Sequence, residues 1–341
     1  SDLTFPFRRY HIGKVYRGER SQKVRFREFY QCDIDIIGNE TLDIINDAEI
    51  PSIIYSTFKD LGFDSFTIKI NNRRVLRGFF QWLGIEDSTE ILRTIDKLEK
   101  IGLDKVKLEL EEQNLDKSII DKIVDFIQIK GTNNEKLQSL KNLGIENDIF
   151  KEGLEELNAV NHYVKAFGVP ETNYSIDLTI ARGLDYYTGT VYETFLDDYP
   201  EIGSVCSGGR YDDLARFYTK QKLPGVGISI GFTRLFYQLN EAKLIKAEDN
   251  SLIKVIIIPM KDCLDEAIET ASTLRNEGIN TQIYLEKGKM GKKFGFADKL
   301  DIPYSIVIGP DEIKKNQYAL RDMKTGEQKL LSMEELLISL K

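Results

Sequence analysis

The feature that most constrains the fold is a pair of β-rich runs near the start of the sequence. Residues 10–16 (YHIGKVY) and 26–37 (FREFYQCDIDII) alternate aromatic or β-branched residues with other types, which is the period of a strand. A charged, turn-like connection, RGERSQK, separates them. The pattern predicts an antiparallel hairpin with a long loop, and therefore a fold organised around a β-sheet.

Two further segments have strand signals next to glycines. The run YSIDLTIARGLDYYTGTVYETFL (174–196) and the short SVCSGG (204–209) form a second pair of β-rich runs. A helix-like stretch follows from Tyr211. The segment PGVGISIGFTRLFYQL (224–239) predicts a strand that passes directly into a helix.

The middle and the end of the chain have different patterns. Residues 88–160 place leucine and isoleucine at helical spacing among many Lys and Glu, which predicts a helical insertion within the β-rich domain. A plain structural appendage explains this insertion at least as well as contact with a partner does.

From Leu252, strand-like and helix-like pieces alternate, so we expect a separate α/β domain of parallel strands and crossover helices. The linker should fall near residues 243–250.

Composition and charge restrict the possible partners. No run of about 18 uncharged apolar residues occurs, and the N-terminus lacks the layout of a secretory signal. We therefore expect a cytoplasmic protein with no membrane partner. The formal charge of -8 argues against nucleic acid, but a polyanion responds to the local field, and basic clusters lie at 17–27 and 287–293. A solvated charged face is the commoner explanation of such clusters.

Cysteines and histidines are too few for several kinds of site. The three cysteines, Cys32, Cys206 and Cys263, are far apart and odd in number, which argues against a disulfide framework and a zinc cluster. Two histidines, His11 and His162, leave little room for a Ser-His-Asp or Cys-His mechanism. The sequence also lacks a GxxxxGK[ST] phosphate loop, so any nucleotide must be held in another way.

Three arginines could hold the phosphates of a nucleotide without such a loop. Arg17 opens the hairpin loop, while Arg182 and Arg234 occur in the two other glycine-containing segments. Each arginine alone is best explained as a surface residue or an ion-pair partner. Together they fit a polyphosphate site, because a guanidinium fork matches phosphate oxygens and keeps its charge. Their convergence is a hypothesis that periodicity alone does not support.

A polar stripe follows the second strand of the hairpin. Alternation puts Gln31, Asp33 and Asp35 on one face, with Phe29 on the same face and Cys32 opposite. This face is either solvated or the lining of a pocket. In a pocket, the carboxylate and amide oxygens could accept hydrogen bonds from an NH-bearing ring, and Phe29 could stack on a base.

At these residues the sequence resembles the class II aminoacyl-tRNA synthetases, and among them the histidyl-tRNA synthetases. YRGERSQKVRFREFYQCDIDIIG resembles the second class II motif, and PGVGISIGFTRL resembles the third. ARGLDYYTGTVYE and SVCSGGRYDDL resemble the two peptides particular to the histidine enzymes. EKGKMGKKFGFADKLDIPYSIVIGPDEI and RDMKTGEQ resemble the family's anticodon-binding domain. The resemblance does not include the first class II motif, a helix and strand that build the family's dimer interface.

The resemblance implies a role for each matching residue. Arg17 would bind the ATP α-phosphate with Glu19 nearby, Phe29 would stack on adenine, and Arg234 would hold the far end of the triphosphate or the adenine face. Arg182 would stabilise the α-phosphoryl charge as the histidine carboxylate attacks. Residues implied in binding the substrate's amine and imidazole are Asp2, Thr4, Gln31, Asp35, Tyr186, Tyr187 and Tyr211.

The resemblance also implies a reaction and an architecture. Histidine would attack ATP, with Mg²⁺ on the phosphates, to give histidyl-adenylate, and the tRNA for histidine would then take the acyl group. The expected fold is α+β: a class II catalytic domain with a six-stranded antiparallel sheet over 1–87 and 161–243, and a helical insertion over 88–160. An α/β anticodon-binding domain over 252–341 would follow, and the protein would be a homodimer.

Two other functions are compatible with this kind of fold. One is a non-catalytic regulatory subunit of histidine biosynthesis that resembles the synthetases; the other is a sensor of uncharged tRNA within a larger kinase. The regulators generally lack an anticodon domain, whereas this chain has one from about Leu252 together with Arg17, Arg182 and Arg234. Nothing in the chain resembles a kinase. The sequence therefore favours the ligase.

Overall fold

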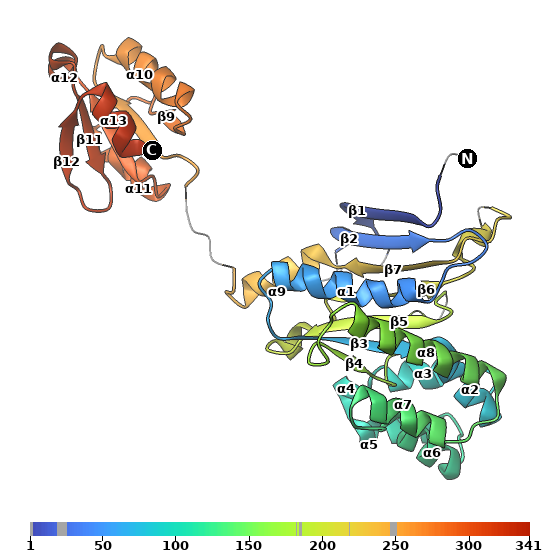
Figure 1. Cartoon of the computed structure of the whole chain (residues 1–341). Helices are drawn as coiled ribbons and strands as arrows, with labels where there is room; N and C mark the ends of the chain where they lie inside the picture. The colour runs from blue at the N-terminus through green and yellow to red at the C-terminus, as the bar shows by residue number, and fades with distance from the viewer. Residues whose placement is uncertain (1–2, 19–25, 182, 184–185, 218, 246–250) are drawn as a thin grey trace. The chain divides into compact units, whose positions relative to one another are not determined.

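The protein folds into two compact units, residues 1–244 and 245–341 (Figure 1). The computed structural model describes all residues except 1–2, 19–25, 182, 184–185, 218 and 246–250. Each unit has buried apolar clusters of its own. The change of unit at 244 lies inside the predicted linker.

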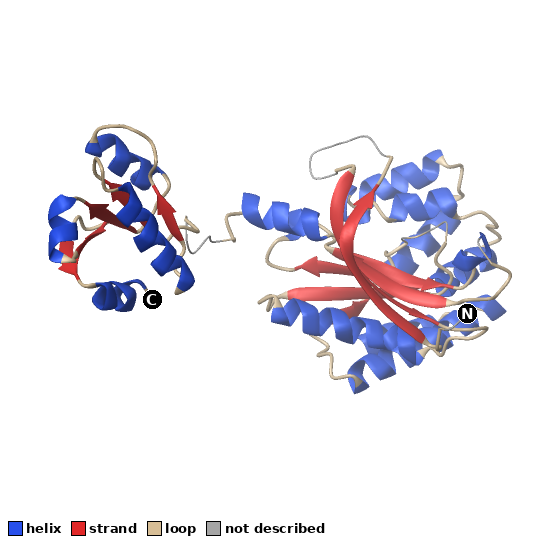
Figure 2. Cartoon of the chain, turned by 90° about the horizontal axis from the view of Figure 1, so that it is seen from above, coloured by secondary structure: helices blue, strands red, loops and turns tan. Residues whose placement is uncertain are grey.

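A twisted sheet forms the centre of the first unit, with helices on its sides (Figure 2). Seven described strands follow the order β1-β2-β7-β6-β5-β3-β4, and neighbouring strands are antiparallel except for β3 and β4, which are parallel. The short parallel strand β4 is an addition to the six-stranded antiparallel sheet that we expected. The strands are β1 (Phe7–Tyr16), β2 (Glu28–Ile37), β3 (Phe66–Asn72), β4 (Tyr174–Ile176), β5 (Thr190–Leu196), β6 (Cys206–Tyr211) and β7 (Gly225–Ile230).

The predicted hairpin is confirmed by the pairing of β1 with β2. Their register runs from Phe7 opposite Ile37 to Tyr16 opposite Glu28. The predicted passage from strand to helix is also confirmed, because β7 is followed by α9 (Phe232–Glu241) after a single glycine. Both results reflect local patterns, the alternation of side chains in one case and the glycine boundary in the other.

Among the described residues, no α-helix begins at Tyr211, where one was expected. Strand β6 continues through Tyr211, which pairs with Gly225 of β7, and a 3-10 turn at Leu214–Phe217 (η2) follows. A further 3-10 turn, η1, spans Pro200–Ile202. Long-range pairing with β7 therefore overrides the local pattern that suggested a helix.

Helices pack against one face of this sheet and against one another. Helix α1 (Ile45–Asp60) packs against β3 and β7, and α8 (Asp148–Ala166) crosses α1 and α2 (Arg73–Trp82). The α2–α8 crossing is close: a Cβ on Gly78 would lie 2.4 Å from the amide nitrogen of Phe150. The remaining helices are α3 (Thr89–Ile95), α4 (Leu98–Ile101), α5 (Leu103–Glu112), α6 (Lys117–Ile127) and α7 (Asn133–Asn142).

The region of the predicted insertion, 88–160, shares a core with the sheet domain. Phe126 of α6 stacks on Phe79 of α2 with ring centroids 3.9 Å apart, and one buried cluster includes residues of both regions. The predicted range also overlaps α8. The division at 88 and 160 thus remains a prediction.

The second unit has a five-stranded sheet of order β12-β11-β10-β8-β9 among its described residues. The expected parallel arrangement is confirmed for β8 (Val255–Pro259), β9 (Thr281–Ile283) and β10 (Tyr304–Ile308). A hairpin of β11 (Tyr318–Asp322) and β12 (Gln328–Leu331) extends the sheet beyond β10. Its two strands are antiparallel because the connection between them is too short for a parallel crossover. The helices are α10 (Leu264–Asn276), α11 (Met290–Lys299), α12 (Pro310–Lys315) and α13 (Met333–Leu340).

Two sequence-level features have a structural counterpart. Cys206 and Cys263 are buried, Cys32 is half-buried, and all three thiols are free. Within the described part of the chain, no helix is both long and apolar enough to pass through a membrane.

Candidate active site

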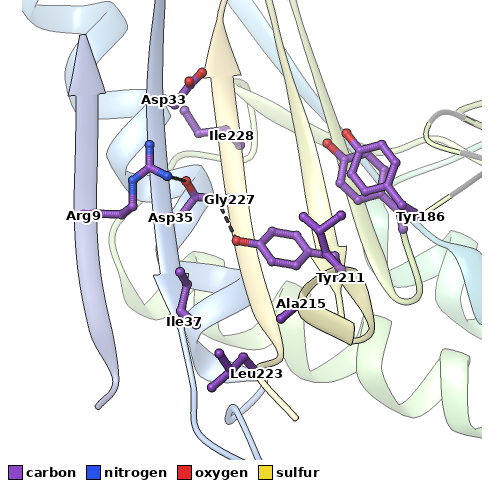
Figure 3. Close-up of a pocket in the computed structure, with 12 residues that line it drawn as sticks. Arg9, Asp33, Asp35, Ile37, Tyr186, Tyr211, Ala215, Leu223, Gly227 and Ile228 are labelled. Carbon is purple, nitrogen blue, oxygen red and sulfur yellow. Dashed lines mark hydrogen bonds and ion pairs between the residues drawn. The ribbon is translucent and has the colours of Figure 1, made fainter. Parts of the chain in front are cut away.

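A cavity of about 440 Å³ opens on the face of the first sheet that lies opposite α1 (Figure 3). Strands β1, β2 and β7 form its floor, and its walls are formed by Tyr186 and Tyr187 and by residues from Tyr211 onward. Its lining residues are Arg9, Asp33, Asp35, Ile37, Tyr186, Tyr187, Tyr211, Leu214, Ala215, Leu223, Gly227 and Ile228.

Asp35 is the polar centre of this cavity. Its Oδ1 accepts a hydrogen bond of 2.8 Å from the hydroxyl of Tyr211, and its Oδ2 lies 3.5 Å from Nη1 of Arg9 (Figure 3). Burial raises the pKa of Asp35, although the bond from Tyr211 and the Arg9 charge oppose that rise. Burial and the nearby Asp35 carboxylate also raise the pKa of Tyr211, which keeps its hydroxyl protonated as a donor.

Glycines make room for these side chains. A Cβ on Gly227 would lie 2.3 Å from Oδ1 of Asp35, and one on Gly225 would lie 2.4 Å from the ring of Tyr211. A Cβ on Gly209 would approach the Tyr187 ring to 3.0 Å. The glycines of β6 and β7 therefore leave room above the sheet for the three side chains that line the cavity, Asp35, Tyr187 and Tyr211.

Two adjacent tyrosines form the wall facing Asp35. The rings of Tyr186 and Tyr187 are 4.2 Å apart between centroids. Tyr187 is half-buried, and burial together with its neighbour Tyr186 raises its pKa. Its backbone nitrogen donates to the carbonyl of Gly183 at 3.0 Å. Tyr186 is more exposed.

The other end of the β2 face has a different chemistry. The Arg17 guanidinium lies 5.0 Å from the centroid of the Phe29 ring. The backbone nitrogen of Tyr30 donates to Oγ1 of Thr233 at 2.8 Å, which joins β2 to the start of α9. Phe29 and Asp35 are on the same strand face, and six residues of strand separate them by about 20 Å. A polar cavity and a cationic, aromatic end thus share one strand.

The structure brings some of the predicted residues together. Asp35, Tyr186, Tyr187 and Tyr211 line one cavity, as the resemblance implies. Arg17 and Phe29 are in contact at the other end of β2. Arg234, in the first turn of α9, donates to the carbonyl of Ile202 at 3.0 Å.

Other predicted residues are not brought into the cavity. Thr4 is exposed, and neither Thr4 nor Gln31 is among the residues that line it. Asp2, Glu19 and Arg182 lie outside the described residues. The convergence of three arginines on one triphosphate therefore remains a prediction.

Sequence reasoning missed two groups of residues. Arg9 lies beside Asp35, and the cross-strand register of the predicted hairpin could have revealed it, because Arg9 is the direct partner of Asp35. The buried pair of Asp47 and Arg210, 0% and 6% exposed, lies behind the cavity wall. No local pattern indicates that pair, since its members are 163 residues apart.

The mainly antiparallel sheet with a polar cavity on one face, followed by a separate α/β unit, is the architecture of a class II aminoacyl-tRNA synthetase. Residues 2–235 match the family described as histidyl-tRNA synthetase, and residues 254–341 match the anticodon binding domain. The chain belongs to the histidyl-tRNA synthetase family.

Named relatives agree with this assignment. The chain is 64% identical over 336 residues to the histidine–tRNA ligase of Clostridium tetani, covering 98% of this chain and 76% of that protein. It is 52% identical over 340 residues to the histidine–tRNA ligase of Finegoldia magna, covering 100% of this chain and 79% of that protein.

Solved structures show the same fold. The crystal structure of histidyl-tRNA synthetase from Nostoc sp. PCC 7120 is 42% identical with a TM-score of 0.81, over 99% of this chain and 78% of that one. A structure from Bacillus halodurans C is described as an ATP phosphoribosyltransferase regulatory subunit/histidyl-tRNA synthetase. It is 20% identical with a TM-score of 0.67, over 87% of this chain and 72% of that one, and indicates the fold alone.

Proposed function

We propose that this protein ligates L-histidine to its tRNA at the expense of ATP, through a histidyl-adenylate intermediate. The observation that most supports this activity is the Asp35–Tyr211 hydrogen bond in a glycine-floored cavity, on the same strand that places Phe29 against Arg17. The relatives named histidine–tRNA ligase at 64% and 52% identity support the same reaction.

Recognition of histidine rests on the polar end of the cavity. The Asp35 carboxylate accepts a hydrogen bond from an imidazole N–H, while Tyr211 donates to Asp35 and keeps that carboxylate in place. Tyr187, with Tyr186 beside it, closes the opposite wall around the ring. A ligand without a ring N–H leaves the half-buried Asp35 carboxylate without this additional hydrogen bond, so the site rejects isosteres by a large factor.

Activation of histidine uses the other end of the strand. Phe29 stacks on adenine, and Arg17, with Glu19, binds the α-phosphate; Arg234 holds the far end of the triphosphate or the adenine face. Arg182 stabilises the charge that develops on the α-phosphoryl group as the histidine carboxylate attacks. Asp2, Thr4 and Gln31 contribute to binding the substrate amine. These roles follow from the family motifs and from the Arg17–Phe29 contact.

Magnesium enters as part of the nucleotide substrate. In the parts of the chain that the structure describes, no three His, Cys, Asp or Glu side chains are grouped to hold a metal ion. This residue set does not fit a resident metal. It is compatible with an ion held mainly by substrate phosphates and water.

Transfer to tRNA uses the second unit. Its anticodon-binding family match at 254–341 and its basic segment at 287–293 support contact with the anticodon arm.

The protein acts in the cytoplasm as a homodimer. The exposed aromatic and apolar residues on one face of β1, Tyr10, Ile12 and Tyr16 at 79%, 66% and 69% exposure, support a protein partner at this sheet edge.

A histidine-dependent exchange of pyrophosphate with ATP tests the proposal. The unmodified protein should catalyse this exchange, and Arg182→Ala should lower its rate by a factor on the order of a hundred or more, because one charge-stabilising donor is lost. Arg77→Ala, on α2, serves as the matched arginine control and should leave the rate near that of the unmodified protein. An intact rate in Arg182→Ala would remove that residue from its role.

The same assay separates the ligase from the regulatory alternative. A regulatory subunit of the synthetase-like kind does not activate histidine and gives no exchange. Exchange that depends on histidine excludes that alternative, whereas its absence in a folded protein would favour it.

A further inference from the structure

A buried ion pair joins α1 to β6 directly behind the cavity. Both Nε and Nη2 of Arg210 donate to the Asp47 carboxylate, at 3.0 Å and 2.7 Å. Nη2 also donates to the carbonyl of Leu42 at 3.0 Å. Asp47 is fully buried and Arg210 nearly so. The guanidinium is therefore held by several acceptors and has one orientation.

The same carboxylate also holds the neighbouring strand. Oγ1 of Thr190 on β5 donates to Oδ2 of Asp47 at 2.7 Å, and the Tyr192 hydroxyl donates to the Asp47 carbonyl at 2.6 Å. In turn, the Arg210 carbonyl accepts from the backbone nitrogen of Thr188 at 2.8 Å. Asp47 and Arg210 thus connect the beginning of β5 to the end of β6.

These two strand ends have the tyrosines of the cavity next to them. Tyr211 follows Arg210, and because successive strand residues point to opposite faces, Arg210 faces α1 while Tyr211 faces the cavity. Tyr187 immediately precedes Thr188, and its ring lies against Gly209. Arg210 therefore directly precedes one tyrosine of the cavity wall, Tyr211. The segment that begins at Thr188 directly follows the other, Tyr187.

We propose that the Asp47–Arg210 pair is a positioning device for histidine recognition, which sets the distance between Tyr187, Tyr211 and Asp35 without touching the substrate. This inference rests on the proposed function of the cavity. A well-packed apolar pair could stabilise the core as well as a buried ion pair does. It could not orient the Leu42 and Thr190 segments at once, because that requires the directional hydrogen bonds of the Arg210 guanidinium and the Asp47 carboxylate.

Two variants separate positioning from stability. Asp47→Asn keeps the shape of the side chain but leaves the Arg210 charge without its buried carboxylate partner, with only the longer Asp212 contact of 3.6 Å remaining. The double variant Asp47→Leu with Arg210→Met removes both charges and restores an apolar core. We expect both variants to raise KM for histidine by roughly tenfold or more, with KM for ATP changed by less than about twofold. The melting temperature should fall in Asp47→Asn and recover in the double variant.

The matched control destabilises the same unit elsewhere. Leu110→Ala truncates a fully buried side chain of α5, and it should lower the melting temperature while leaving KM for histidine unchanged. If KM for histidine in the double variant returned to the normal value together with stability, the pair would be structural only and the inference would be overturned.

A measurement without substrate keeps the two proposals distinguishable. Hydrogen exchange of the Thr188 amide, which donates to the backbone carbonyl of Arg210, should be faster in both variants at Asp47, because the end of β6 is no longer held by the side-chain bonds, and unchanged in Leu110→Ala. If the unmodified protein shows no histidine-dependent pyrophosphate exchange, the proposed function fails, and the amide exchange still decides whether the pair positions the wall. Unchanged exchange at Thr188 would refute the positioning role.

Discussion

Asp35 is a partly buried carboxylate whose proposed role in binding histidine has a cost in stability. Burial makes the ionised carboxylate of Asp35 less favourable in the folded protein than in the unfolded chain, which is why its pKa is raised. The Tyr211 hydroxyl and Arg9 compensate only in part. In the proposed function, this carboxylate is the acceptor for a ring N–H of the substrate.

Replacing this carboxylate should therefore stabilise the protein and impair histidine binding. Asp35→Asn keeps an oxygen for the Tyr211 hydroxyl but removes the charge. For an acid with a raised folded pKa, stability falls as pH rises from the unfolded pKa through the folded one. We expect a higher melting temperature for Asp35→Asn near pH 7, a difference that disappears below about pH 3.8, the ordinary pKa of aspartate.

The binding measurement for this variant uses both substrates. KM for histidine should rise by about a hundredfold, and KM for ATP should stay within about threefold. Asp213→Asn, which follows β6 and is exposed, is the control and should change neither quantity. Equal effects of Asp35→Asn on histidine and ATP would argue against the imidazole contact.

At the scale of elements, sequence patterns predict hairpins and strand–helix passages within one segment, whereas pairing between distant strands determines the remaining structure. The β1–β2 hairpin and the β7–α9 passage could be predicted because alternation and glycine boundaries lie within one segment. The helix expected from Tyr211 is wrong because β6 pairs with β7 through that residue. Cavity residues from β2, β6 and the Tyr186 turn could be named only through the family motifs, since alternation does not reveal which strands become neighbours.

The edge of the sheet at β4 depends on a side chain from the helical region. Oδ1 of Asn133, at the start of α7, accepts from the backbone nitrogen of Ile176 at 2.7 Å, and Nδ2 donates to the Tyr174 carbonyl at 3.4 Å. Lys136, one turn later, donates to the Ile176 carbonyl at 2.6 Å. Helix α7 thus satisfies backbone groups of an edge strand that would otherwise need another partner.

Removing that amide should weaken the first unit. Asn133→Ala leaves the Ile176 N–H buried without its acceptor, which costs about 1–3 kcal/mol in the free energy of unfolding. Asn158→Ala, an exposed position on α8, should change it by less than about 0.5 kcal/mol. Urea unfolding of the two variants measures the difference. Equal stabilities would mean that α7 does not support the edge of the sheet.

At the scale of the whole molecule, the two units have separate cores. The apolar clusters of the second unit contain only its own residues, among them Ile257, Leu274 and Ile306, and the family matches divide in the same place, at 2–235 and 254–341. A unit with its own core can be removed without exposing the core of the other. Activation of histidine and recognition of tRNA should therefore be separable.

Deleting residues 252–341 should leave histidine-dependent pyrophosphate exchange within about threefold of the undeleted protein, because Asp35, Tyr211 and the Arg17–Phe29 contact all belong to the first unit. Aminoacylation should fall by a factor on the order of a hundred or more, since a second tRNA contact multiplies affinity through effective concentration. A truncated protein that melts cooperatively yet lacks exchange would show that the second unit contributes to the adenylation site. Unreduced aminoacylation would instead remove residues 252–341 from tRNA recognition, because binding by the first unit would then suffice.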